Sequence, residues 1–275
     1  MNSGMQPTKA YLEDNAYLGW TGLLVGAVLG LGTAFLWNQF LGRRERSDVV
    51  GSRKTAESKM LETGSSMLQN LGPVNSIHLH LCGMHFYNGS MDRQIEAHHY
   101  CSRLSEDFHQ CVIYDSNEPN ARLIGIEYVI SKKIYDQLDA DEKKLWHSHV
   151  YEVGSGMLMA PGLPEAAEHK IMSHLIGTYG KTFHLWHVDQ NPLFPEGIPQ
   201  LMMAFTADGQ IYPHMVKHLE KRLGQTMARK RILRRDIKRP LVDPLADSWQ
   251  SGEVLQLRVM DVAQEAERVT PQLRM

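Results

Sequence analysis

One apolar segment near the N-terminus limits what this chain can fold into more than any other feature. Residues 15–42 contain no charged side chain, and residues 17–37 are almost uninterruptedly apolar. As an α-helix rising about 1.5 Å per residue, residues 17–37 would extend roughly 30 Å, which matches the hydrocarbon core of a bilayer. We therefore predict a single transmembrane helix over residues 17–41.

The flanks of this segment predict its orientation in a membrane. Arg43, Arg44 and Arg46 follow the segment directly, whereas the residues before it carry mixed charges. Because positively charged flanks stay on the cytosolic side, we expect the remainder of the chain in the cytosol. A cleavable signal peptide is the alternative interpretation. It is disfavoured because residues 37–40 lack the small side chains of a cleavage site.

Three glycines recur at every fourth position within the predicted anchor. Gly22, Gly26 and Gly30 would fall along one stripe of a helix. Small residues at this spacing let a second helix approach closely in a bilayer. The stripe therefore predicts a homodimer contact between two anchors. The general abundance of glycine in membrane helices is the alternative explanation.

The rest of the chain divides into a polar tether and one folded domain. Residues 42–72 are rich in Gly, Ser and charged side chains, which is typical of a tether. Strand-like and helix-like patterns begin near Pro73, the predicted start of the domain. The predicted organisation is a short N-terminal tail (1–16), the anchor (17–41), the tether (42–72), an α+β domain with a basic C-terminal helix (73–250) and a C-terminal tail (251–275).

Hydrophobic patterning within the domain predicts short strands mixed with helices. Residues 77–82 alternate with period two, so His78, His80 and Cys82 should share one face of a strand. A loop of turn-forming residues separates two β-rich runs and predicts a hairpin. The mixed order favours an α+β fold with a mixed, largely antiparallel sheet and flanking helices. The predicted strands are residues 77–82, 110–114, 123–130, 147–159, 183–188 and 201–206, and the predicted helices are residues 92–107, 139–146 and 164–179.

Charge is distributed unevenly along the chain. The formal net charge is −2, which argues against a nucleic-acid partner. Residues 217–239 nevertheless carry ten basic and two acidic side chains, so this segment has a local charge of +8. Two interpretations remain open, a solvated helix face or a surface that lies on anionic membrane lipid. The second interpretation would use Arg229, Lys230, Arg231, Arg234 and Arg235, together with the arginines that follow the anchor.

The cysteines predict free thiols. Cys82, Cys101 and Cys111 are widely spaced and include no C-x-x-C pair. An odd number at this spacing favours a reducing compartment over a disulfide framework, and it excludes a zinc site of four thiolates. We expect all three to be buried as small hydrophobic side chains.

Histidine is the most unusual component of the domain. All 14 histidines lie between His78 and His218. Paired imidazoles on one strand face, with a nearby carboxylate, are ligands that one divalent ion such as Zn²⁺, Mn²⁺ or Fe²⁺ prefers. Half-buried rings bonded to backbone carbonyls, or metal-free acid–base catalysis, are the alternatives. The paired candidates are His78 with His80, His147 with His149 and Glu152, and His184 with His187.

Several ordered blocks of sequence are distinctive, namely MDRQIEAHHYC (91–101), QCVIYD (110–115), ARLIGIEY (121–128), KLWHSHVYEV (144–153), YGKT (179–182) and GIPQLMM (197–203). Together they resemble the oil body-associated protein family. The resemblance covers roughly residues 60–250. It implies a protein of lipid-droplet or membrane surfaces and names no reaction, and the chain contains none of the usual enzyme signatures.

The predicted anchor departs from the plant pattern of this family. A spanning helix with polar ends on both sides cannot sit in a droplet monolayer without burying one polar end, so the departure favours a true membrane. We therefore expect a single-pass membrane protein that binds membrane lipid and organises lipid storage or a membrane surface without catalysis. A metal-dependent enzyme that uses the strand-borne histidine pairs is the alternative.

Overall fold

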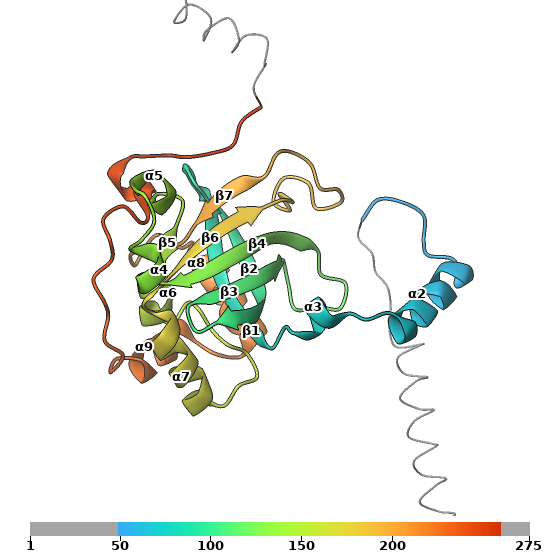
Figure 1. Ribbon diagram of the computed structural model, residues 1–275, viewed down its shortest axis with the longest axis horizontal. Coiled ribbons are helices and arrows are strands. Elements are labelled where there is room, and N and C mark those ends of the chain that lie inside the picture. Colours follow the sequence, from blue (N-terminus) through green and yellow to red (C-terminus); the bar gives the residue numbers. More distant parts are fainter. Residues whose placement is uncertain (1–48, 260–275) are drawn as a thin grey trace, which may run out of the picture. The chain divides into compact units, whose positions relative to one another are not determined.

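Residues 49–259 are described in the computed structural model, and their strands form one antiparallel sheet that closes on itself (Figure 1). Hydrogen-bonded neighbours follow the order β4-β3-β2-β1-β7-β6, and β6 pairs in turn with β4. The short β5 pairs with the part of β6 that β7 leaves open. The strands are β1 (Leu79–Tyr87), β2 (Ser90–Ser105), β3 (Phe108–Tyr114), β4 (Leu123–Ser131), β5 (His147–Ser148), β6 (Thr178–His184) and β7 (Gln200–Met203).

Local sequence explains the antiparallel connections. Asn88 and Gly89 form the tight turn between β1 and β2, and Gly89 has a φ of +88°, which a residue without a side chain adopts at little cost. β3 alternates strictly between buried and partly exposed residues, as a strand with one face on a core must. The hairpin of β3 and β4 confirms the prediction from the turn-forming loop between them.

Helices cover the sheet from outside. α6, α7 and α9 lie together in Figure 1, and α6 contacts α9. Asp139 caps α5 by accepting a hydrogen bond from the Glu142 amide, and α5 lies within the predicted helix 139–146. The helices of the described residues are α2 (Ala56–Leu68), α3 (Gly72–Asn75), α4 (Lys132–Tyr135), α5 (Ala140–Lys143), α6 (Val150–Ser155), α7 (Glu165–Leu175), α8 (Pro213–Leu223) and α9 (Met227–Leu233), with a short 3₁₀ turn at Ser248–Ser251.

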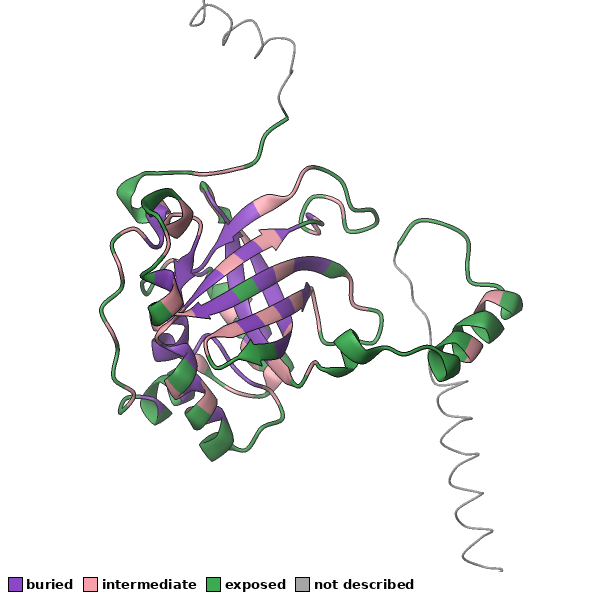
Figure 2. Ribbon diagram, in the orientation of Figure 1, coloured by how far each residue is buried: buried purple, intermediate pink, exposed green. Residues whose placement is uncertain are grey.

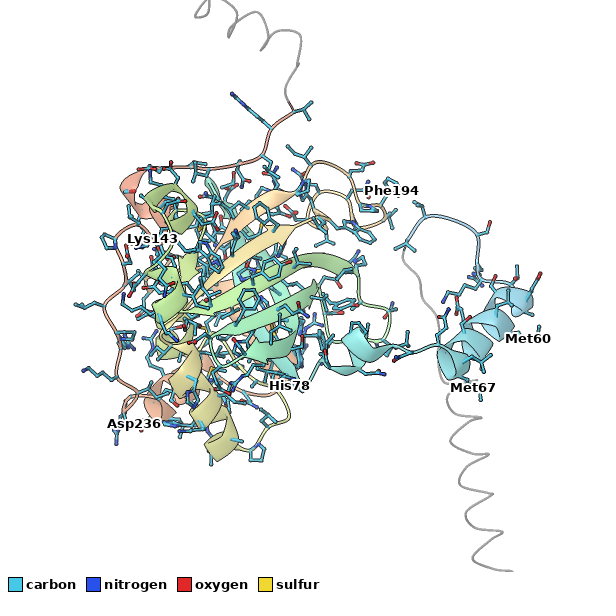
Figure 3. All side chains as sticks on the ribbon, viewed as in Figure 1. Met60, Met67, His78, Lys143, Phe194 and Asp236 are labelled. Atoms are coloured by element: carbon cyan, nitrogen blue, oxygen red, sulfur yellow. A yellow bond between two sulfur atoms is a disulfide. The ribbon has the colours of Figure 1, made fainter. Side chains whose placement is uncertain are left out.

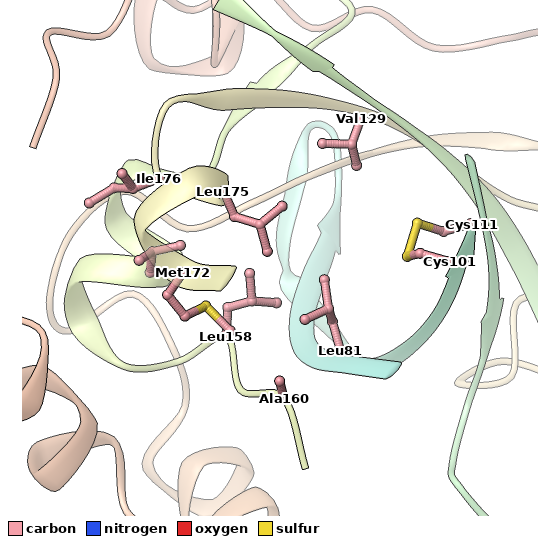
Figure 4. Packing of buried hydrophobic residues seen from close by; sticks show 10 residues of the cluster. Leu81, Cys101, Cys111, Val129, Leu158, Ala160, Met172, Leu175 and Ile176 are labelled. Atoms are coloured by element: carbon pink, nitrogen blue, oxygen red, sulfur yellow. A yellow bond between two sulfur atoms is a disulfide. The ribbon is translucent and has the colours of Figure 1, made fainter. Parts of the chain in front are cut away.

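The buried core lies on both faces of the strands (Figure 2). On the outer face, Met84 and Phe86 of β1 pack in one apolar cluster with Leu219 of α8. On the inner face, one cluster joins β1, β2, β3 and β4 to α7, as Figure 4 shows around Leu81 and Leu175. A second inner cluster contains Tyr87, Ile95, Ala97, Ile113, Ile124 and Met202.

Several predicted elements differ from the structure. Residues 92–105 belong to β2 and not to a helix. The prediction failed because the middle of this strand is buried on both faces, where buried polar residues hide the period-two pattern. Of the predicted strand 147–159, only β5 is a strand. α6 follows it and is terminated by Gly156, which adopts a left-handed conformation. The helix that begins after Pro164 ends at Leu175, and β6 starts three residues later.

The prediction of three free thiols is also wrong. Cys101 and Cys111 form a disulfide, and Cys82 is free and buried. The two bonded residues are direct partners in the register of β2 and β3. Their Cα atoms lie 4.0 Å apart across the sheet, a proximity that depends on strand pairing and has no signature in cysteine spacing.

The predicted anchor over residues 17–41 lies outside the described residues, as do Arg43, Arg44 and Arg46. Between residues 49 and 259, no helix combines the length and apolarity needed to cross a bilayer. Within the predicted tether, α2 has no buried residue. Met60 and Met67, labelled in Figure 3, are 69% and 80% exposed on this helix.

Candidate metal centre inside the closed sheet

A polar layer lies between the two apolar clusters on the inner face of the sheet. On β2, His99 stands between Ala97 and Cys101, which belong to different clusters. His85 has the corresponding position on β1, and Glu127 points to the same interior from β4. Because alternate residues of a strand share one face, the closed sheet brings side chains from distant segments to one place.

Glu127 is the central carboxylate of this layer and is only 2% exposed. Its Oε2 lies 2.7 Å from His99 Nε2, and its Oε1 lies 3.4 Å from His147 Nε2 and 3.3 Å from His149 Nε2. Burial alone would raise the pKa of Glu127, but these three imidazoles outweigh burial and hold the pKa well below its usual range. Glu127 is therefore a carboxylate surrounded by ring nitrogens.

The tautomer of His149 follows from its second contact. The Thr178 hydroxyl donates to the Leu175 carbonyl oxygen at 2.7 Å, so its oxygen must accept the 2.7 Å hydrogen bond from His149 Nδ1–H. Burial lowers the pKa of His149, while its contact with Glu127 acts in the opposite direction. With Nδ1 committed to Thr178, His149 Nε2 lies 3.3 Å from Glu127 Oε1, and a proton or a metal ion must lie between these two atoms.

Other rings of the layer have no hydrogen-bond partner among the described residues. Both ring nitrogens of His99, His147 and His184 are buried and unpaired, and so is Nδ1 of His85. Burial lowers the pKa of His184 to about 3, with the neighbouring imidazole of His99 adding to the effect. Burial also keeps the pKa of His85 well below its usual range. A buried nitrogen without a hydrogen-bond partner destabilises the folded state. This concentration of such nitrogens therefore indicates a site that binds an ion.

Glu152 of α6 completes the layer. Its side chain is buried, and its Oε2 lies 3.8 Å from His149 Nε2 without a hydrogen bond of its own. Burial raises the pKa of Glu152 to about 8. A cavity of about 20 Å³ lies beside these groups and has room for one water molecule. Its polar lining consists of His85, His99, Glu127, His149 and Glu152.

The donor set fits a divalent transition metal. Neutral imidazoles and carboxylates are the ligands of Zn²⁺, Mn²⁺ and Fe²⁺. Ligand atoms of His85, His99 and Glu127 lie within 4.8 Å of one another, and so do those of Glu127, His147 and His149. Thr178 acts behind His149 as the group that fixes a ligating ring in metal sites.

The sequence candidates divide between this centre and the rest of the domain. His147, His149, Glu152 and His184 lie in the polar layer. The other three do not join either ligand group. His78, labelled in Figure 3, is exposed next to the start of β1, His80 lies on the outer face of β1, and His187 packs its ring against Tyr87.

Sequence reasoning missed His85, His99 and Glu127. The available signal was the alternation of β1 continued beyond residue 82, which places His85 on the face opposite His80. His99 was assigned to a helix, in which adjacent His98 and His99 diverge by about 100°. In the strand they point to opposite faces, so only His99 enters the interior.

A second polar cluster lies on the outer face under α8. Cys82 Sγ lies 3.6 Å from His98 Nε2, which also lies 2.8 Å from Glu96 Oε1. His80 Nε2 bonds His98 Nδ1 at 3.0 Å, and Arg222 Nε lies 3.0 Å from Glu96 Oε1. Each of these side chains has a partner within the protein. The outer cluster therefore lacks the unpaired nitrogens that distinguish the interior centre.

Part of the basic segment 217–239 is buried in ion pairs within the domain. Lys230 and Arg234 are 3% and 4% exposed, and both form ion pairs with Glu168 of α7. They are therefore unavailable to a lipid surface, in contrast to the sequence-based expectation, whereas Arg235 is exposed. Two further basic side chains form ion pairs near the surface, Arg229 with Glu165 and Arg231 with Asp208.

Comparison with known proteins identifies the family. A family model described as "Protein of unknown function (DUF1264)" matches residues 71–238. Oil body-associated protein 1B of Arabidopsis thaliana is 47% identical over 169 residues, which cover 62% of this chain and 70% of the relative. Oil body-associated protein 1A of Zea mays is 43% identical over 164 residues, which cover 60% and 69% respectively. No solved structure matches the chain significantly. The protein belongs to the oil body-associated protein family.

Proposed function

We propose that the protein is a metal-dependent enzyme whose centre lies inside the closed sheet and whose activity serves lipid storage. The observation that carries the metal is the contact of His149 Nε2 with the Glu127 carboxylate at 3.3 Å, while Nδ1 of the same ring is committed to Thr178. A proton or a metal ion must lie between Nε2 and the carboxylate. The unpaired nitrogens of His99, His147 and His184 favour the metal ion.

The surroundings of the centre favour catalysis over a purely structural ion. A structural zinc site is closed by four ligands, whereas this layer offers more donors and a water-sized cavity. A bound ion would supply Lewis acidity and lower the pKa of a bound water. Glu152 Oε2 has no hydrogen-bond partner among residues 49–259 and lines the cavity as a further carboxylate donor.

Elemental analysis of the purified full chain in detergent tests this proposal. We expect a stoichiometric content of Zn, Mn or Fe in the unmodified protein and in His78→Ala, because His78 is exposed outside the centre. His149→Ala should lose metal while far-ultraviolet circular dichroism stays unchanged. A folded protein without stoichiometric metal after reconstitution with each of these ions would refute the proposal.

The location of the protein is a separate proposal. Its relatives carry the name oil body-associated, and residues 17–41 have the length and apolarity of a membrane anchor followed by arginines. We propose a single-pass membrane protein with a cytosolic domain, in contact with lipid-storage bodies and able to dimerise through Gly22, Gly26 and Gly30. Organisation of the lipid surface without catalysis is the second candidate function, favoured by the anchor.

Protease protection in sealed membrane vesicles tests the topology. Tags at either end should show a digested C-terminal domain and a protected N-terminus when the cytosolic face is outside. Deletion of residues 17–41 should release the domain from the membrane fraction. A protected C-terminal domain, or a deletion variant that stays bound, would contradict the proposed anchor.

A further inference from the structure

We infer that the interior centre holds two metal ions bridged by the Glu127 carboxylate. This inference rests on the proposed function, because it concerns the number of ions at the same centre. It begins with the number of donors. Five imidazoles and two carboxylates line the layer, which is more than the four protein ligands of a typical zinc ion. They are His85, His99, His147, His149, His184, Glu127 and Glu152.

The donors separate into two groups that share one residue. His85 and His99 form one group with Glu127, and His147 and His149 form the other with Glu127. Within each group the ligand atoms lie within 4.8 Å of one another. Each group therefore encloses a position for one ion, and only Glu127 takes part in both.

The two oxygens of Glu127 face different groups. Oε2 lies 2.7 Å from His99 Nε2, whereas Oε1 lies 3.3 Å from His149 Nε2 and 3.4 Å from His147 Nε2. The contact to His99 is short, yet His99 Nε2 is not aligned to donate a hydrogen bond to it. A nitrogen and an oxygen that are this close without a hydrogen bond between them can both be ligands of one ion. A carboxylate that uses one oxygen for each ion suits the separation of about 3.5–4 Å found in two-metal sites.

The remaining donors are neighbours of the two groups. The His184 ring lies 5.7 Å from the His85 ring, between centroids, so His184 is a neighbour of the first group. Glu152 Oε2 lies 3.8 Å from His149 Nε2, so Glu152 is a neighbour of the second. Each group supplies three protein donors when Glu127 is counted for both, and His184 and Glu152 are the candidates for a fourth. The cavity of about 20 Å³ lies between the polar layer and the apolar side chains around Leu81 and Leu175, and it has the size of one water molecule.

Gly180 supports this crowded arrangement. A Cβ atom at this position would collide with Glu127 Oε1 and His147 Nε2. The backbone of β6 therefore passes close to both groups because residue 180 has no side chain. The space that the missing side chain leaves is occupied by a carboxylate oxygen and a ring nitrogen, the donors of the second position.

Reconstitution of the full chain with Mn²⁺ in detergent tests the inference. We expect two Mn²⁺ per chain by elemental analysis and the electron paramagnetic resonance spectrum of an exchange-coupled pair. His99→Ala, which removes a donor of the first position only, should retain one Mn²⁺ with an uncoupled six-line spectrum. The control His78→Ala should retain the coupled pair.

The outcomes separate this inference from the proposed function. One Mn²⁺ per chain with an uncoupled spectrum in the unmodified protein would overturn the two-ion centre and leave the metal-dependent function standing. Two Mn²⁺ without exchange coupling would also overturn it, because ions bridged by one carboxylate must interact. No stoichiometric binding of Mn²⁺, Zn²⁺ or Fe²⁺ would overturn both proposals.

Discussion

Gly180 and His147 are direct register partners on β6 and β5, and the missing side chain of Gly180 leaves the space that the His147 ring occupies. The same space admits the Glu127 carboxylate from β4. One glycine thus permits two donors from separate segments to approach each other. The only sign of this contact in the sequence is a glycine within a strand, where glycine often marks the close approach of another group to the backbone.

Gly180→Ala should damage the centre. The new methyl group must displace Glu127 or His147, so we expect metal affinity to fall by about 10- to 100-fold and the free energy of unfolding to drop by about 1–3 kcal/mol. Competition with a fluorescent chelator measures the first effect. Gly177→Ala is the matched control, because its nearest neighbour would be Pro240 Cγ at 3.9 Å. Unchanged affinity in Gly180→Ala would contradict the placement of these donors.

Glu168→Gln should destabilise the domain strongly. Glu168 is 3% exposed and is the ion-pair partner of both Lys230 and Arg234, so its loss leaves two buried cations without a carboxylate. We expect a loss of about 3–5 kcal/mol in the free energy of unfolding, measured by urea denaturation. Glu165→Gln removes an exposed pair with Arg229 and should cost less than about 1 kcal/mol. Equal losses in the two variants would refute the buried network.

Asp189 should contribute to stability in an acid-sensitive way. Burial alone would raise the pKa of Asp189, but hydrogen bonds from Arg93 (2.7 Å) and Tyr87 (2.9 Å) outweigh it and lower the pKa. Because the folded pKa lies below the unfolded value of about 3.9, this stabilisation is complete above the unfolded pKa and is lost as the pH falls through the folded pKa.

Asp189→Asn is therefore expected to lower the free energy of unfolding by about 1–2 kcal/mol at pH 7 and by less near pH 3. Urea denaturation at a series of pH values measures the difference. Asp141→Asn, at a side chain that is 97% exposed, serves as the control and should follow the unmodified protein at every pH. A deficit in Asp189→Asn that grows toward acid would show that the sign is wrong.

The disulfide should be detectable in the purified protein. Alkylation in denaturant without reductant is expected to label Cys82 alone, and labelling after reduction should reach all three cysteines. The variant with Cys101→Ala and Cys111→Ala should lose about 3 kcal/mol in the free energy of unfolding, by the loop-closure relation for ten residues. In Cys82→Ala, reductant should lower stability as it does in the unmodified protein. Three labelled cysteines without reductant would contradict the bond.

The family was predictable from the sequence. The alternation of β1 and the turn before β4 predicted local structure correctly because each depends on neighbours along the chain. The sequence named four of the seven interior side chains as candidate ligands, and their role in binding a metal stays a prediction. β2 was wrongly predicted as a helix, because both of its faces are buried and its polar residues obscure the period-two pattern.

By itself, the sequence determined the family, the α+β class with its antiparallel sheet, and a pool of imidazoles confined to one domain. Only the tertiary structure decided which of these imidazoles lie close together. Pairing of β4 with β6 closes the sheet and brings Glu127 opposite residues more than fifty positions away. The register of β2 with β3 joins Cys101 to Cys111, and the alternation of faces along β2 separates His99 from His98. These contacts depend on which strands pair and in which register. A local sequence pattern determines neither, because strand pairing joins segments that are distant in the chain.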